Sequence, residues 1–205
     1  MALIDKLNAI GDAIRAKTGK ADKLALDQMP TEIASIETGG GGVDIQLLID
    51  RTITEVSSAS DRIGDYVFYG CTQLTKIDLP VATSIGNEAF YNCVKLGSVE
   101  LPNVTRIAGS AFRLCSALTS LDLPSLTSIE SNVFRNCGKL QSLILRSETV
   151  CTLGTNVFTS TPIASGTGYI YVPSRLVEGY KSATNWSAYA EQIRAIEDYP
   201  ETTGS

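Results

Sequence analysis

The chain has 205 residues, of which 43% are hydrophobic and 19% charged, and its formal net charge is -5. This composition predicts one folded domain with appendages, and the acidic balance excludes a surface built to bind nucleic acid or anionic lipid. The sequence contains no histidine, which excludes Ser-His-Asp and Cys-His catalysis, histidine metal ligands and histidine pH switches.

The start of the chain predicts neither a secretory signal nor a membrane anchor. Asp5, Asn8 and Asp12 fall where a signal peptide has an unbroken apolar core. No apolar run approaches the roughly 18 residues of a transmembrane helix. We therefore expect no membrane insertion.

Residues 1–38 predict a helical attachment or oligomerisation module. Four apolar residues are spaced four, three and four apart and share one stripe of a helix: Leu3, Leu7, Ile10 and Ile14. A second short helix is predicted within residues 26–36, and a glycine-rich linker follows at 39–43. The stripe has to bury against something. It either caps the rest of this chain or docks on a partner, which includes assembly of a homo-oligomer.

The middle of the chain repeats itself. Four consecutive segments align without gaps, at residues 63–84, 85–106, 107–128 and 129–152, and a fifth, degenerate segment begins at Leu153. Apolar residues at positions 15 and 17 of each segment predict a short strand with one face inward, and a proline then ends the strand in the first three. A coil of 22 residues buries too little to fold alone, so stacking of coils into a solenoid is predicted over residues 44–172.

The repeat motif resembles that of the BspA-like leucine-rich repeats. Residues 85–102, IGNEAFYNCVKLGSVELP, follow the pattern I-G-x-x-A-F-x-x-C-x-x-L-x-x-I-x-L-P, and the resemblance covers about residues 50–172. It implies an α/β fold: a right-handed leucine-rich-repeat solenoid of five to six coils with short parallel strands on one face. Members of this family are mostly surface-associated bacterial and protozoan proteins, so the resemblance implies a protein or cell-surface glycan ligand and no enzymatic activity.

The segment after the repeats predicts a cap. Residues 169–172 read as the last strand, and Pro173 and Ser174 end it and begin a capping helix within residues 173–198. The helix is aromatic, and we expect it to cover the open end of the core with Tyr180, Trp186, Tyr189 and Ile193. Residues 199–205 predict a flexible tail.

Both ends of the chain resemble segments of tail-associated proteins from phages and prophages of Gram-positive gut bacteria. The resemblance rests on AIGDAIRAKTGKADKLALDQMPTEIASI at residues 9–36 and YVPSRLVEGYKSATNWSAYAEQI at residues 171–193. It implies a virion location, in which residues 1–38 attach to the virion and the solenoid contacts a host receptor. The alternative is a bacterial cell-surface adhesin of the BspA-like type.

A column of cysteines invites a metal hypothesis. Cys71, Cys93, Cys115 and Cys137 recur every 22 residues, which places their sulfurs on neighbouring coils about 5 Å apart in a line. Ligands in a line cannot surround a tetrahedral zinc ion. We interpret the column as small side chains that fill a tight corner of the core, and we predict no metal and no cofactor.

Two columns predicted to face outward contain the candidate binding residues. The first lies on the strands and contains Asp78, Glu100 and Asp122, with Ile144 next in line and Lys76 two residues before Asp78. Its carboxylates either sit in water or meet a basic partner, because carboxylates in a line do not enclose Ca²⁺. The second is Tyr69, Tyr91, Arg113 and Arg135, residue types enriched at binding hot spots. Alternatively, the stems of this second column only cover the phenylalanines beneath.

Enzyme motifs are absent from the sequence. It contains no P-loop, GxSxG or HExxH pattern. The sequence therefore predicts a protein-interaction or structural role without catalysis.

Overall fold

The computed structural model describes residues 51–200. The predicted N-terminal module, its Leu3, Leu7, Ile10 and Ile14, the linker at 39–43 and residues 201–205 lie outside the described residues.

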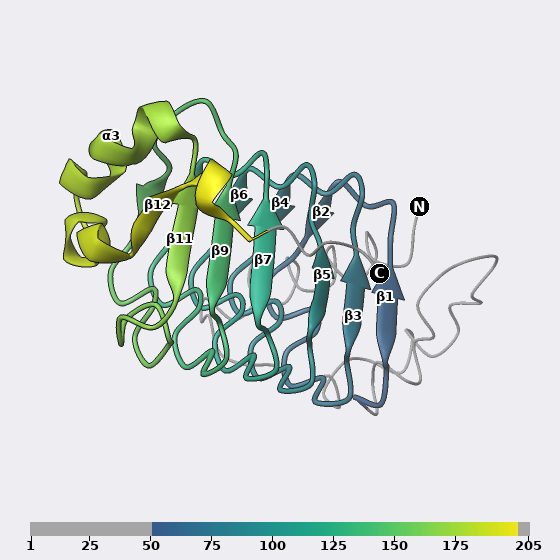
Figure 1. Cartoon of the computed structure of the whole chain (residues 1–205). Helices are drawn as coiled ribbons and strands as arrows, with labels where there is room; N and C mark the ends of the chain where they lie inside the picture. The colour runs from purple at the N-terminus through teal and green to yellow at the C-terminus, as the bar shows by residue number, and fades with distance from the viewer. Residues whose placement is uncertain (1–50, 201–205) are drawn as a thin grey trace, which may run out of the picture.

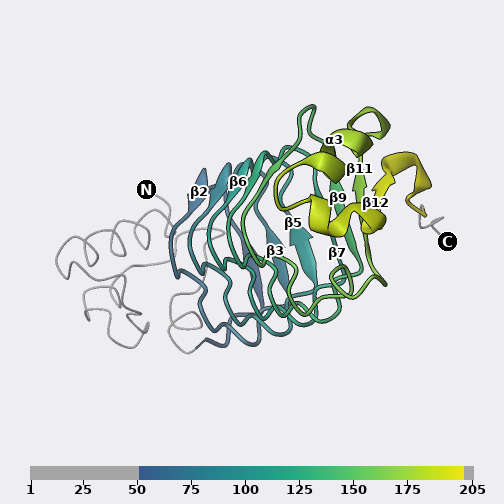
Figure 2. The same ribbon diagram turned by 90° about the vertical axis from the view of Figure 1, so that its left-hand side faces the viewer.

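Short parallel strands stack on two sides of the coils (Figures 1 and 2). One side carries a three-stranded sheet of order β1-β3-β5 and a four-stranded sheet of order β12-β11-β9-β7. Their strands are β1 Glu55–Ser57, β3 Lys76–Asp78, β5 Ser98–Glu100, β7 Ser120–Leu123, β9 Ser142–Leu145, β11 Tyr169–Val172 and β12 Ile193–Ala195. We call the outward side of these seven strands the front face. The other side carries a five-stranded sheet of order β10-β8-β6-β4-β2. Its strands are β2 Arg62–Ile63, β4 Ser84–Ile85, β6 Arg106–Ile107, β8 Ser128–Ile129 and β10 Thr152–Leu153.

The register of the strands follows the sequence repeat. Lys76 pairs with Ser98 and Ile77 with Val99, so equivalent positions of successive coils lie side by side. The inward columns consequently form one continuous core, as the sequence predicts. The phenylalanines stack along it, all fully buried, with ring centroids 5.2, 5.2, 5.9 and 6.1 Å apart: Phe68, Phe90, Phe112, Phe134 and Phe158. The fold is thus a leucine-rich-repeat solenoid of short parallel strands.

The turns between the two sides are irregular rather than helical. Each coil uses left-handed backbone at two positions of the turn; Glu88 and Asn92 have φ of 50° and 60°, and Asn132 and Asn136 have φ of 62° and 63°. Asparagine tolerates this conformation because its short polar side chain bonds locally. The turns also bond from coil to coil, since the amide of Phe90 donates to the carbonyl of Ala111 at 2.9 Å.

Gly86 marks a place where two neighbouring coils approach closely. A Cβ added at Gly86 would lie 2.5 Å from Asp65 Oδ1 and 2.6 Å from Gly64 C. We expect Gly86→Ala to lower the free energy of unfolding by about 1–3 kcal/mol, because the backbone of the neighbouring coil has to move. The matched control is Gly138→Ala, where an added Cβ meets nothing within 4 Å. Equal urea midpoints for the two variants would contradict the expected packing.

The C-terminal segment covers the end of the core, at the opposite end from β1 (Figure 1). Tyr180 and Trp186 are both fully buried, and the Trp186 ring lies 6.2 Å from Phe158 between centroids. The cap is composite: it comprises η3 Ser174–Leu176, α3 Val177–Ser182, η4 Ser187–Gln192, β12 and η5 Ile196–Asp198. No helix within residues 51–200 is long and apolar enough to cross a bilayer.

The cap differs from the single helix that the sequence predicts. The helix α3 has six residues and ends where Ala183 is extended and Asn185 adopts a φ of 64°. Ser174 makes no capping bond; its hydroxyl donates to Glu197 Oε1 at 3.2 Å. Ile193 begins a strand, because β12 pairs with the edge of β11 and adds one more parallel strand to the sheet.

Polar atoms of the cap also bond the backbone of the last coil. The Tyr180 hydroxyl accepts from the Cys151 amide at 3.0 Å, and Trp186 Nε1 donates to the Cys151 carbonyl at 2.6 Å. Asn185 Nδ2 donates to the Leu153 carbonyl at 2.6 Å. Burial raises the pKa of Tyr180 to about 12, so its hydroxyl stays protonated. The cap thereby supplies the partners that a further coil would otherwise provide.

Candidate functional site

The cysteine column belongs to the core. All four thiols are fully buried and free. Cys93 Sγ–H donates to the Phe68 carbonyl at 3.2 Å, and Cys115 and Cys137 donate in the same way to Phe90 and Phe112 at 3.2 and 3.1 Å. Each of these thiols therefore adds a second hydrogen bond to a carbonyl on the preceding coil that already accepts one from a backbone amide, a role that the sequence did not reveal. Among residues 51–200 no group of three histidine, cysteine or acidic residues is placed to hold a metal ion.

These thiols should be inert in the folded protein. Burial raises the pKa of Cys71, Cys137 and Cys151 to about 12, so few thiolates form at neutral pH. We expect Ellman's reagent at pH 8 to react slowly with the native chain. In guanidinium chloride it should react rapidly with all five cysteines. The pKa of each buried thiol is higher in the folded chain than in the unfolded chain. The contribution of these thiols to the free energy of unfolding is therefore fully present below about pH 9 and is lost as the pH rises further. Native labelling as fast as that of free glutathione would contradict this.

The second predicted column forms a packed row on the turn side of the solenoid. We call Tyr69, Tyr91, Arg113 and Arg135 the Tyr–Arg row. The rings of Tyr69 and Tyr91 stack with centroids 4.7 Å apart, and the Arg113 guanidinium carbon lies 5.6 Å from the Tyr91 centroid.

The side chains of the Tyr–Arg row are only partly exposed: all four are half-buried. The sequence had left open whether they face a partner or cover the phenylalanines beneath. The Nε atoms of Arg113 and Arg135 are buried without a hydrogen-bond partner. The structure brings Tyr69, Tyr91 and Arg113 into contact, and Arg135 follows on the next coil.

The first predicted column lies on the front face. Asp78 pairs in register with Glu100, and Asp122 with Ile144. Lys76, Glu100 and Asp122 are exposed and Asp78 is half-buried, whereas Ile144 is only 3% exposed. We call Asp78, Glu100 and Asp122 the acidic row of the front face; it ends at the apolar Ile144.

One acid of this row already has a cation. Arg146 binds Asp122 with both ends of its guanidinium, Nη2 to Oδ2 at 2.8 Å and Nε to Oδ1 at 3.1 Å. Hydrogen bonding to Asp122 raises the pKa of Arg146. The sequence analysis missed this pair, although Arg146 stands where the three earlier repeats have proline. Among residues 51–200, Asp78 and Glu100 form no ion pair.

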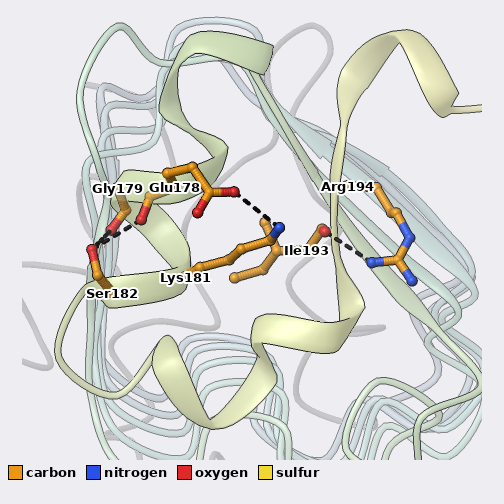
Figure 3. A network of polar contacts seen from close by, with 6 residues as sticks. All are labelled: Glu178, Gly179, Lys181, Ser182, Ile193 and Arg194. Atoms are coloured by element: carbon orange, nitrogen blue, oxygen red, sulfur yellow. Dashed lines mark hydrogen bonds and ion pairs between the residues drawn. The ribbon is translucent and has the colours of Figure 1, made fainter.

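A cleft lies at the cap end of the front face. It has a volume of about 340 Å³ and is lined by Tyr169 and Tyr171 of β11, Arg194 of β12 and Asp198 of η5. The Arg194 guanidinium lies over the Tyr169 ring, 5.0 Å from its centroid, and its Nη1 donates to the Ile193 carbonyl at 3.0 Å (Figure 3). Burial raises the pKa of Tyr171.

The sequence analysis did not single out the cleft. It contained one signal, because the alternation Tyr-Ile-Tyr-Val at residues 169–172 turns both tyrosines away from the core. Arg194 and Asp198 reach the same place through the return of the chain after the cap, which no repeat pattern specifies.

Comparisons with known proteins agree with this geometry. A family model described as the BspA type leucine rich repeat region matches residues 51–167 in six copies. The chain is similar to the crystal structure of a leucine rich repeat protein from T. pallidum, with 27% identity and a TM-score of 0.50 over 58% of this chain and 57% of that one. It is also similar to a leucine-rich repeat protein from Bacteroides ovatus, with 25% identity and a TM-score of 0.52 over 70% of this chain and 36% of that one. This chain therefore spans less than two thirds of either structure. No curated protein matches it significantly.

Proposed function

Because this chain belongs to the BspA-type leucine-rich repeat family, we propose that it is a non-enzymatic binding protein whose solenoid contacts a protein or glycan on another surface. The main support for this proposal is the front face. Its seven strands hold outward side chains in fixed rows, the arrangement that repeat proteins use for extended binding surfaces. Leucine-rich repeats of this type are an interaction fold, and no feature of the front face requires catalysis.

The charges of the front face favour a partner with a basic patch. Asp78 and Glu100 lie side by side in register, and like charges at strand spacing repel each other slightly. A cation from a partner would relieve this repulsion, as Arg146 does for Asp122 within the chain. The Tyr–Arg row is a weaker candidate, because its four side chains are half-buried and the Nε atoms of Arg113 and Arg135 are enclosed.

A cell-binding assay tests this function. Fluorescently labelled full chain is added to a panel of Gram-positive gut bacteria, and bound protein is measured by flow cytometry. We expect saturable binding that weakens at least tenfold in Asp78→Lys/Glu100→Lys. The control Asp61→Lys/Glu191→Lys changes two exposed acids outside the front face and alters net charge equally. Absence of saturable binding, or equal loss in the control, would contradict the proposal.

We propose that the protein is a component of a phage or prophage tail. The support is in the sequence: the apolar stripe of residues 1–38, the glycine-rich linker and the two terminal segments that resemble tail-associated proteins. The alternative is a bacterial cell-surface adhesin, which is the usual setting of the repeat family. Immunogold labelling separates the two, since antibody against the solenoid marks tail ends of induced particles in one case and the cell envelope in the other.

The N-terminal module has its own test. Absolute mass by light scattering is measured for the full chain and for residues 44–205. An oligomer that becomes a monomer on truncation supports self-assembly through Leu3, Leu7, Ile10 and Ile14. A monomer in both cases removes self-assembly, and leaves docking on another protein or capping of the solenoid.

A further inference from the structure

The cleft at the cap end of the front face has a lining that identifies a class of ligand. We propose that it binds one ring of a neutral saccharide, and that longer saccharides extend from it along the front face. The inference rests on the proposed binding function and names the ligand of one part of that surface. The volume of about 340 Å³ falls within the roughly 300–1,000 Å³ of small-molecule sites.

The charges in the cleft favour an uncharged ligand. Arg194 and Asp198 line it together, so a cation meets Arg194 and an anion meets Asp198. An apolar ligand would remove both groups from water without giving either a hydrogen bond, which is costly. A ligand with hydroxyl groups satisfies both, because a hydroxyl accepts from the guanidinium and donates to the carboxylate.

The tyrosines supply the other half of the recognition. Tyr169 and Tyr171 lie 6.3 Å apart between ring centroids, with their planes at 56°. Tyr169 is half-buried and offers more surface to a ligand than Tyr171, which is 6% exposed. A sugar ring has apolar C–H faces as well as hydroxyl edges, and an aromatic wall with a polar tip suits both. A neutral sugar is therefore the ligand class that uses every side chain of the lining.

The lining is held in place before any ligand arrives. Tyr171 is 6% exposed and its ring meets the Tyr199 ring edge-on at 4.9 Å. Arg194 is held over the Tyr169 ring. It also bonds the Ile193 carbonyl, as Figure 3 shows. Groups that are already ordered lose little entropy on binding.

A row of serines continues from the cleft. Ser142 pairs in register with Tyr169, and Ser120 with Ser142. Both serines are half-buried on the outward side of their strands, so they offer hydroxyl groups along a shallow floor. Neighbouring units of an oligosaccharide can bond this row while one unit occupies the cleft.

Saturation-transfer-difference NMR on the full chain tests the inference. The probes are chitotetraose, cellotetraose and mannotetraose as neutral saccharides, and a hyaluronan tetrasaccharide as an anionic one. We expect signal transfer to at least one neutral probe and at least tenfold weaker binding of the anionic probe. Tyr169→Ala and Asp198→Ala should each weaken binding at least tenfold, while Tyr66→Ala, which removes a half-buried tyrosine outside the cleft, should not. Near-UV circular dichroism checks that each variant is folded.

Several outcomes would overturn the inference. These are no transfer to any neutral probe, unchanged binding in both cleft variants, or tighter binding of the anionic probe. Loss of binding in Tyr66→Ala as large as in the cleft variants would place the sugar outside the cleft. If cells bind through Asp78 and Glu100 but no saccharide binds, the binding function stands and the saccharide assignment falls.

Discussion

Replacing Phe112 by alanine is expected to lower the free energy of unfolding by about 3–5 kcal/mol. Phe112 is fully buried at the centre of the phenylalanine stack, with Phe90 and Phe134 on either side at 5.2 and 5.9 Å. Truncation leaves a cavity between two coils that contact each other mainly through these columns. In a solenoid each coil contacts only its neighbours, so no other part of the chain compensates for the loss.

Urea unfolding followed by circular dichroism measures this effect. Val81→Ala is the control, because Val81 is 45% exposed and its truncation should change stability by less than about 0.5 kcal/mol. If the two variants unfold at the same urea concentration, the stack does not hold the coils together.

The second large effect is expected at the cap. Trp186→Ala should cost about 3–5 kcal/mol, because it uncovers Phe158 and removes the donor to the Cys151 carbonyl. Trp186→Phe keeps most of the ring and isolates the hydrogen bond, with an expected cost of about 1–3 kcal/mol for the carbonyl left unpaired in the core.

Stability of both Trp186 variants is measured by urea unfolding with circular dichroism. In the unmodified chain Trp186 is the only tryptophan, so its fluorescence reports on the cap. We expect fluorescence and circular dichroism to change at the same urea concentration. A fluorescence transition at clearly lower urea would show that the cap opens before the coils and contributes little to their stability.

The sequence predicts those parts of the structure that the repeat period sets. A spacing of 22 residues aligns Phe90 with Phe112 and Cys93 with Cys115, and the inward columns then follow from strand alternation. The composite cap was not predictable in the same way. The left-handed Asn185 and the pairing of β12 with β11 are tertiary solutions to an exposed strand edge, and local helix signals do not contain them.

The candidate sites show the same division. The acidic row on the front face follows from the repeat, whereas the Arg146–Asp122 pair arises where a repeat departs from its consensus. The cleft needs the pairing of Ser142 with Tyr169, which are 27 residues apart instead of 22, and the later return of Arg194. The Tyr–Arg row was predicted as a line of neighbours. How deeply it is buried was left open, because the packing of long side chains across coils depends on rotamers that spacing does not fix.

The constant register between coils also makes the number of coils adjustable. Deleting residues 85–106 would bring the coil of residues 63–84 against that of residues 107–128 through the same columns, with Phe68 against Phe112. The strand stack would shorten by one inter-strand spacing of about 4.8 Å. The cleft would keep its lining, since β11, β12 and η5 all follow the last repeat. Gain or loss of whole repeats can therefore change the distance of the cleft from the beginning of the solenoid while its lining residues stay the same.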